Sequence, residues 1–364
     1  MRLCYMAPAS VIHTVRWVNA MAARGHDVSL ITMHAPARDA IDQRVHVIQL
    51  RVKAPAGYYL NVFEARKQLR QMDPDVLHAH YASGYGTLAR LVRFNPTLLS
   101  VWGSDVFAFP ERGERQQRLL TKNLQAATHV TSTSHAMKAR TETFLQSKRP
   151  IDVIPFGIDL DRFQPAEAPK QDNSLITIGT VKKLEPIYGI DRLLRSICQL
   201  LENLHFASQN ELAARIRVRI VGDGPQKDEL KQQALSLGLA DITTFCGAVP
   251  NEDVPEQLHQ LDIYEALSRQ ESFGVAVLEA SACGVPVLTS DAEGLPEVVQ
   301  DGETGFTVDG DDIEAAAEKL QTLATEQDLR RQMGEKGRTF VRTHYDWQAN
   351  VSQMEAVYQQ LAGR

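Results

Sequence analysis

The chain has 364 residues, of which 43% are hydrophobic and 23% charged, and its net charge is -6. This length exceeds that of one typical core, so two domains are expected, and the composition excludes a disordered or fibrous protein. No apolar run approaches the roughly 20 residues of a membrane-spanning helix.

The charge is distributed unevenly along the chain. Residues 1–160 hold 20 basic and 12 acidic residues, a net charge of +8, whereas residues 161–364 hold 19 and 33, a net charge of -14. This asymmetry predicts two domains with different partners. The acidic half argues against nucleic-acid binding. The basic half either faces an anionic membrane surface or carries ordinary surface charge.

The four cysteines are scattered without metal-ligand spacing: Cys4, Cys198, Cys246 and Cys283. They suit small buried residues in a reducing cytoplasm. The first residues resemble a strand rather than a signal peptide, so a cytoplasmic location is expected.

Short apolar runs alternate with helical patterns in the first half, which is typical of parallel sheets flanked by helices. The pattern predicts helices at 14–25 and 86–94. It predicts strands at 2–7, 27–32, 75–80, 97–102 and 129–134. Residues 151–165 are rich in Pro, Gly and Asp and have the composition of a domain junction.

The second half repeats this alternation. Helices are predicted at 189–204 and 226–238, and strands at 174–181, 216–224, 242–247, 262–268, 285–290 and 304–309. The sequence therefore predicts two Rossmann-like α/β domains, 1–160 and 161–340, followed by a C-terminal segment, 341–364. Ligands of such sheets bind outside the carboxyl ends of the strands.

A nicotinamide-dependent dehydrogenase would share this fold class. The first strand–helix turn, "APASVIHTVRW", lacks the G-x-G-x-x-G that forms the tight phosphate-binding turn. The stretch "IVGDGPQKDEL" has too few glycines to replace it. The sequence therefore disfavours a dinucleotide cofactor.

The stretch "ESFGVAVLEASACGVPVLTS", residues 271–290, places two carboxylates around a short helix. Gly274 precedes a helix expected from Val275 to Cys283, whose first turn suits a phosphate group. Glu271 lies just before that helix and Glu279 one turn inside it. They are suited to accept hydrogen bonds from hydroxyl groups on either side of a pyrophosphate, which is the layout of a sugar nucleotide.

Together with "IVGDGPQKDEL", "VIPFGIDLDRF" and "IGTVKKLEPIYGIDRLL", this stretch resembles the retaining glycosyltransferases of family 4. The resemblance spans nearly the whole sequence. It implies the GT-B fold, in which two Rossmann-like domains face each other across a cleft and the C-terminal helix returns to the N-terminal domain. It also implies a nucleoside-diphosphate sugar as donor and no cofactor or metal.

The resemblance assigns the donor site to the second half of the chain. Glu271 is expected to contact the transferred hexose, and Glu279 the ribose hydroxyls. The backbone amides of Phe273, Gly274 and Val275 are expected to hold hexose and phosphate, and Gly222 and Val249 also belong to the donor-binding set.

The cations that neutralise the diphosphate match the family only in part. Lys182 or Lys183 fits the first cationic position, and of the two Lys183 is assigned to the catalytic set and Lys182 to the donor-binding set. Ile187 and Tyr188 stand where family members have a lysine. Arg269 is a possible substitute for that lysine.

The acceptor is expected at the first half. Trp102 replaces a family histidine, and Asp105 is expected in the catalytic set, either binding an acceptor hydroxyl or ordering its loop. His13 lies near the start of the first helix. His78 and His80 are two apart in a strand and share a face, and His80 is assigned to the cleft.

Two acidic motifs resemble metal sites but suit turns. Asp309–Asp311 opens a helix, where Asp caps free amides, and Asp159–Asp161 lies in the junction.

The predicted reaction transfers a sugar to an acceptor hydroxyl, with a glycan or lipid-linked molecule as acceptor. A sugar-nucleotide epimerase and a non-catalytic sugar-nucleotide binder remain alternatives. Arg66, Lys67 and Arg70 either meet lipid phosphates or form a solvated helix face.

Overall fold

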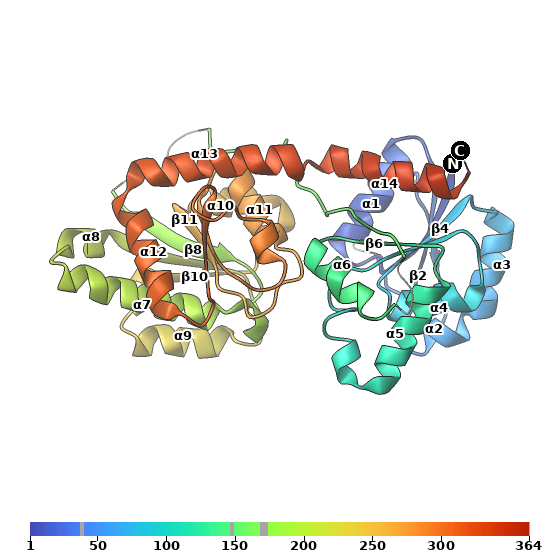
Figure 1. Cartoon of the computed structure of the whole chain (residues 1–364), viewed down its shortest axis with the longest axis horizontal. Coiled ribbons are helices and arrows are strands. Elements are labelled where there is room, and N and C mark those ends of the chain that lie inside the picture. The colour runs from blue at the N-terminus through green and yellow to red at the C-terminus, as the bar shows by residue number, and fades with distance from the viewer. Residues whose placement is uncertain (37–39, 146–148, 168–173, 364) are drawn as a thin grey trace. The chain divides into compact units, whose positions relative to one another are not determined.

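The computed structural model describes residues 1–36, 40–145, 149–167 and 174–363. The chain divides into two compact units. Unit 1 contains Met1–Phe156 and Gln348–Arg364, and unit 2 contains Gly157–Trp347. Each unit is built on one parallel sheet with helices on it (Figure 1), which confirms the predicted pair of Rossmann-like domains.

Unit 1 has a seven-stranded sheet in the order β3-β2-β1-β4-β5-β6-β7. Its strands are β1 (Arg2–Met6), β2 (Asp27–Thr32), β3 (His46–Gln49), β4 (Val76–His80), β5 (Thr97–Ser100), β6 (His129–Ser132) and β7 (Ile151–Val153). Its helices are α1 (Ile12–Ala23), α2 (Gly57–Leu60), α3 (Val62–Met72), α4 (Gly84–Val92), α5 (Glu114–Ala126) and α6 (His135–Glu142). The central strands β4 and β5 are buried along their whole length because helices cover both faces of a parallel sheet.

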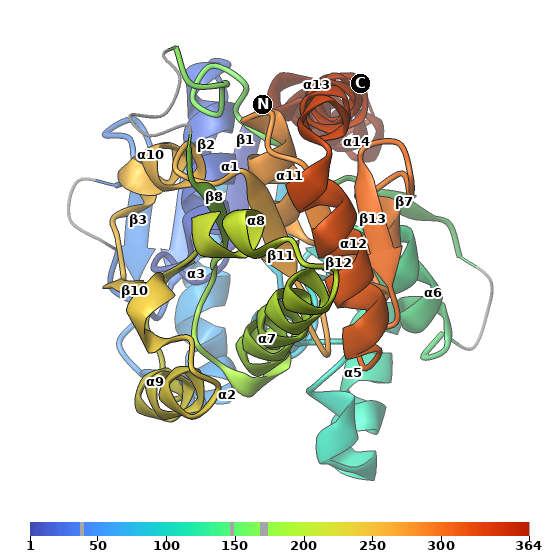
Figure 2. The ribbon, with the colours of Figure 1, turned by 90° about the vertical axis from the view of Figure 1, so that its left-hand side faces the viewer.

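Unit 2 has a six-stranded sheet in the order β10-β9-β8-β11-β12-β13. Its strands are β8 (Ile176–Val181), β9 (Ile216–Val221), β10 (Thr243–Gly247), β11 (Ile263–Ala266), β12 (Val287–Ser290) and β13 (Gly305–Val308). Its helices are α7 (Ile190–Phe206), α8 (Asn210–Arg215), α9 (Lys227–Ser236), α10 (Val254–Leu258), α11 (Val275–Ala282), α12 (Ile313–Thr325) and α13 (Gln327–His344). Helices α7 and α12 lie side by side (Figure 2), and their apolar faces join the core of this unit.

The C-terminal segment divides differently from the prediction. Residues 341–347 belong to unit 2 because α13 continues to His344, and only α14 (Trp347–Leu361) reaches unit 1, from Gln348 onwards. None of the helices in the described part of the chain combines the length and the apolar character needed to cross a bilayer.

A buried chain of polar groups ties α14 to the sheet of unit 1. The Tyr358 hydroxyl lies 2.7 Å from the Tyr5 hydroxyl and 2.7 Å from His78 Nδ1. His78 Nε2 lies 2.7 Å from Ser100 Oγ, which lies 2.6 Å from Thr131 Oγ1. Four strands and one helix thus share a network in which each member has a partner, as buried polar groups require.

Candidate functional site

The residues predicted to bind the donor lie at the carboxyl ends of four neighbouring strands of unit 2. Lys182 follows β8, Gly222 follows β9, Val249 lies two residues beyond β10, and Glu271 lies in the loop after β11. These strands are adjacent and parallel in the order β10-β9-β8-β11, so their carboxyl ends meet at one edge of the sheet. This is the edge at which open α/β sheets bind ligands.

Lys182 and Glu271 form a buried ion pair at this edge. The Lys182 ammonium group contacts a carboxylate oxygen of Glu271, and the two side chains are only 6% and 15% exposed. The same ammonium group lies 3.3 Å from Ser268 Oγ and 4.7 Å from the centre of the Tyr188 ring. A cation and a carboxylate are therefore held together where the sequence predicts contact with phosphate and sugar.

The short helix after Glu271 begins as predicted. Gly274 has a φ of +103°, a conformation that favours glycine, and α11 starts at the next residue. Phe273 is buried and its ring centre lies 5.7 Å from that of Tyr345. Glu279 lies one turn inside α11. Burial, together with the nearby carboxylates of Glu271 and Glu279, raises the pKa of the Tyr264 hydroxyl, so both acids lie near one buried tyrosine.

Two of the predicted cations lie differently from Lys182. The side chain of Lys183 is 74% exposed, with its ammonium group 4.0 Å from Glu185 Oε1. The terminal nitrogens of Arg269 donate to the two carboxylate oxygens of Asp191 at 2.6 and 2.7 Å, and one also donates to the Pro186 carbonyl oxygen at 3.0 Å. Lys182 rather than Lys183 is therefore the partner of Glu271, and Arg269 is engaged by the first turn of α7 and the loop before it.

The acidic motif at Asp309–Asp311 contributes an ion-pair partner to a buried arginine, Arg192. Asp311 forms an ion pair with Arg192, whose guanidinium lies 3.4 Å from the Leu267 carbonyl oxygen and 3.5 Å from that of Ser268. The next residue, Asp312, caps α12 by accepting the Ala315 N–H at 2.9 Å. Both contacts agree with the interpretation of this motif as a turn.

The three residues predicted to bind the acceptor lie together in unit 1. His80 ends β4, Trp102 follows β5, and His13 lies in the first turn of α1, the helix that follows β1. The Trp102 ring centre lies 4.0 Å from that of His80 and 6.1 Å from that of His13. His13 stacks on Phe156, with ring centres 3.8 Å apart and planes 10° apart. The cluster is mostly apolar, because carbon faces rather than hydrogen bonds join its members.

Both histidines of this cluster are neutral near pH 7. Burial, reinforced by the Arg16 charge, lowers the pKa of His13 to about 3, and burial also lowers the pKa of His80. His80 Nδ1 lies 3.2 Å from Thr14 Oγ1. Among the described residues, His13 Nδ1 and His80 Nε2 are buried without a hydrogen-bond partner. These two nitrogens are available to a ligand or a water molecule.

Asp105 orders a loop rather than presenting a carboxylate. One of its oxygens accepts the N–H groups of Trp102 at 3.1 Å and Gly103 at 2.9 Å, and the other accepts the Ala82 N–H at 2.7 Å. The side chain is buried, and burial raises its pKa. These contacts match the second of the two roles expected of Asp105, because its carboxylate joins the loops after β4 and β5 and so positions Trp102.

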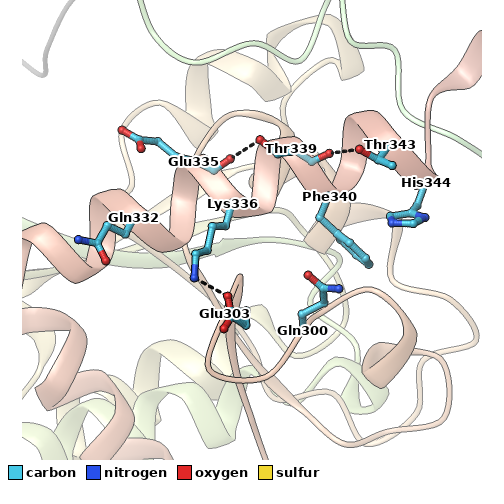
Figure 3. A pocket seen from close by; sticks show the side chains of 9 residues that line it. All are labelled: Gln300, Glu303, Gln332, Glu335, Lys336, Thr339, Phe340, Thr343 and His344. Atoms are coloured by element: carbon cyan, nitrogen blue, oxygen red, sulfur yellow. Dashed lines mark hydrogen bonds and ion pairs between the residues drawn. The ribbon is translucent and has the colours of Figure 1, made fainter.

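A cavity of about 590 Å³ in unit 2 contains none of the predicted site residues (Figure 3). One helical face of α13 lines it, opposite the loop that carries Gln300 and Glu303. An ion pair between Lys336 and Glu303 crosses it, so the charges of these two groups are already matched. This cavity does not contribute to the candidate site.

Known families account for both halves of the chain. Residues 161–340 match the family model described as "Glycosyl transferases group 1", and residues 2–134 match "Glycosyl transferase 4-like". A curated relative, N-acetyl-alpha-D-glucosaminyl L-malate synthase of Bacillus anthracis, is 26% identical over 93% of this chain and 90% of its own length.

The chain is a glycosyltransferase of the GT-B fold.

Solved structures agree with this fold along the whole chain. Sucrose-phosphate synthase of Thermosynechococcus elongatus superposes with a TM-score of 0.84 at 20% identity, covering 99% of both chains. Anabaena HepE in complex with UDP-glucose superposes with a TM-score of 0.79 at 19% identity, covering 99% of this chain and 100% of that one. At these identities the superpositions describe the fold only.

Sequence reasoning missed several residues of the glycosyltransferase that surround the predicted ones. Tyr188 and Ser268 contact Lys182, Arg192 holds the loop that leads to Glu271, and Phe156 stacks on His13. The position of Tyr188 could have been found from the sequence, because it stands where the family has a lysine. In the structure its ring contacts the Lys182 ammonium group. The other three have no local signal, since their partners lie far away in the sequence.

Replacing Gly222 by alanine will destabilise unit 2 of the glycosyltransferase by about 3 kcal/mol or more. Gly222 has a φ of +144°, and a Cβ there would lie 1.8 Å from the Lys182 carbonyl oxygen. Chemical denaturation measures this loss. The matched control is Gly238→Ala, at a φ of +70° with no atom within 4 Å of the added Cβ, which should cost about 1–2 kcal/mol. Equal losses in the two variants would contradict the close approach of Gly222 to Lys182.

Proposed function

We propose that this glycosyltransferase moves a hexose or N-acetylhexosamine from a nucleoside-diphosphate sugar to an acceptor hydroxyl, with retention at the anomeric carbon. The observation that carries the proposal is the buried Lys182–Glu271 ion pair at the carboxyl edge of the sheet in unit 2. Two similar proteins support the donor class, since HepE, which shares the fold, is crystallised with UDP-glucose and a curated relative is named N-acetyl-alpha-D-glucosaminyl L-malate synthase.

In this proposal the bound donor takes over part of the contact between Lys182 and Glu271: its diphosphate meets the ammonium group and its hexose meets the carboxylate. The Lys182 ammonium group neutralises the charge that develops on the departing diphosphate, and charge stabilisation of this kind is usually the largest catalytic contribution. Glu271 then accepts a hydrogen bond from a hexose hydroxyl, and Glu279 from a ribose hydroxyl. The backbone amides of Phe273, Gly274 and Val275 bind the hexose and the phosphate at the start of α11.

The bond changes follow a front-face substitution. The bond between the anomeric carbon and the phosphate oxygen breaks, and the acceptor oxygen bonds to that carbon from the same side. The acceptor proton passes to the departing diphosphate oxygen, so no separate base is required. The protein contributes positioning and charge stabilisation, and we assign no metal or cofactor to it.

The acceptor binds unit 1 in this proposal, around His13, His80 and Trp102. Asp105 supports it indirectly, because it fixes the loop that carries Trp102. A lipid-linked or envelope glycan at the cytoplasmic face of a membrane is the proposed acceptor, in line with the basic balance of residues 1–160.

The test begins with the donor. UDP-, GDP- and ADP-sugars are screened by thermal shift, and the sugar that raises the melting temperature is supplied with candidate acceptors. Proton NMR of the product should show the anomeric configuration of the donor. Glu271→Ala and the isosteric Glu271→Gln should both lose transfer. Wild-type turnover by Glu271→Gln, or an inverted anomeric product, would refute the assignment, and an isomerised donor formed without acceptor would indicate an epimerase.

A further inference from the structure

The segment α2–α3 of unit 1 exposes three large apolar side chains within five residues. Tyr59 is 53% exposed, Leu60 66% and Phe63 82%. The other exposed large hydrophobic residues in the described part of the chain are Ile12, Ile187, Phe206 and Leu235, each on a different element. Single exposed apolar residues are ordinary, whereas a cluster of them marks a binding surface.

Contacts of the neighbouring residues Tyr58 and Asn61 with the rest of unit 1 hold the backbone of this cluster in place. The Tyr58 ring packs against Tyr85, with ring centres 5.4 Å apart. The Asn61 side chain donates to the Val52 carbonyl oxygen at 2.7 Å and accepts the Val52 N–H at 3.1 Å. Tyr58 and Asn61 thus anchor α2, while Tyr59, Leu60 and Phe63 point outwards. The exposure is therefore a property of the folded surface.

Basic side chains lie on the same face of α3 as the exposed Phe63. Lys67 and Arg70 follow Phe63 by four and seven residues, which places them on one helical face. Neither of them has an ion-pair partner among the described residues. Residues 51–73 contain five Lys or Arg and two acids. Both acids face other cations, since Glu64 lies 3.9 Å from Arg51 and Asp73 lies 3.0 Å from Arg2.

A basic cavity of about 430 Å³ adjoins this face, between α3 and the C-terminal end of α4. Arg66, Arg70 and Arg93 line it together with Phe94 and one acid, Asp73. Arg66 already donates to the carbonyl oxygens of Leu91 at 2.7 Å and Val92 at 3.2 Å. Arg70 and Arg93 are thus left to receive an anionic group.

We infer that Tyr59, Leu60, Phe63, Lys67 and Arg70 form a surface that docks on an anionic phospholipid bilayer, and we call it the α2–α3 surface. Aromatic and aliphatic side chains beside Lys and Arg are typical of segments that lie in a membrane interface. The apolar side chains enter the boundary between headgroups and acyl chains, and the cations bind lipid phosphates. This inference does not depend on the proposed sugar transfer.

The test uses the full chain and vesicle co-sedimentation. Vesicles of phosphatidylcholine alone are compared with vesicles in which one third of the lipid is phosphatidylglycerol. The wild type should bind the anionic vesicles, and high salt should weaken binding. Lys67→Ala with Arg70→Ala should lower the partition coefficient about thirtyfold, and Leu60→Ser with Phe63→Ser at least about tenfold.

Matched controls remove similar groups from unit 2. Phe206→Ser removes a side chain that is 96% exposed, and Lys231→Ala with Arg331→Ala removes two exposed charges. These variants should bind lipid as the wild type does. Thermal unfolding and nucleotide-sugar binding verify that each variant is folded, and Phe63→Ser alone replaces the double variant if that one unfolds.

Three results would overturn the inference. They are absence of wild-type binding to the anionic vesicles, equal binding to both kinds of vesicle, and equal losses in the controls. Self-association in solution that Leu60→Ser with Phe63→Ser abolishes would instead assign the surface to a second copy of the chain.

Discussion

Lys182→Ala will lower kcat for sugar transfer by about 100- to 1000-fold, whereas Lys183→Ala will change it by less than about twofold. Lys182 is almost fully buried against Glu271, where an ammonium group can stabilise the charge of a departing diphosphate. Lys183 is adjacent in sequence but faces solvent, where a single charge is strongly screened. Steady-state kinetics with the identified donor measure both values.

The structural effect of Lys182→Ala must be separated from its catalytic effect. Removing the lysine leaves the Glu271 carboxylate buried without its cation, and breaking a buried pair can cost about 3–5 kcal/mol of stability. The combined variant Lys182→Met with Glu271→Gln removes both charges and should regain stability without regaining transfer. If Lys183→Ala loses as much activity as Lys182→Ala, the selection of Lys182 is wrong.

Acidification from pH 7 to 5 will destabilise unit 1 and stabilise unit 2. In unit 1, burial lowers the pKa of His13 and His78 to about 3, and that of His80 is lowered as well. A histidine in the unfolded chain has a pKa of about 6.5, so below that pH the unfolded chain binds protons that the folded unit does not bind. His13 and His78 should therefore each cost about 2 kcal/mol at pH 5, and His80 acts in the same direction. The lowered pKa of Glu355 acts in the same direction, and the raised pKa of Asp105 opposes it.

Unit 2 responds in the opposite sense because of one buried acid. Glu265 in β11 is fully buried, with one oxygen 2.7 Å from Ser196 Oγ, and burial raises its pKa to about 8. Between pH 4.5 and 8 the folded unit holds a proton that the unfolded chain releases, so this acid destabilises unit 2 less as the pH falls. The gain from pH 7 to 5 should be about 2–3 kcal/mol.

Pulse proteolysis across a urea gradient at each pH, with the fragments identified by mass spectrometry, measures the two units separately. Glu265→Gln is the control, because it should remove the pH response of unit 2 while leaving that of unit 1. A shift of both units in the same direction would contradict this prediction.

The sequence predicted the strands better than their ends. The predicted strands at 27–32 and 75–80 correspond to β2 and β4, because strands that are buried on both faces are rich in apolar residues. The predicted strand at 97–102 ends early, since Asp105 takes the N–H groups of Trp102 and Gly103. The edge strand β3 was missed because its four residues, "HVIQ", carry no clear pattern.

The sequence predicted those parts of the candidate site that are formed by neighbouring residues. It did not predict contacts between residues that are far apart in the chain. The turn at Gly274 and the helix that follows it come from neighbouring residues. Only one of Lys182 and Lys183 can point at Glu271, because neighbouring residues at the end of β8 point in different directions. The local sequence does not indicate which of the two it is. The engagement of Arg269 by Asp191 joins residues 78 positions apart, so no spacing rule could reveal it.

The buried chain from Tyr5 through Tyr358 to His78 makes the last helix an internal part of unit 1. A gene shortened after residue 156 would leave the His78 ring and the Tyr5 hydroxyl inside the sheet with no partner from α14. Expression of the first half alone should therefore yield an unstable product. Both chain ends belong to unit 1 (Figure 1), so a rearranged gene that joins residues 348–363 ahead of residue 1 is the rational way to produce this half by itself.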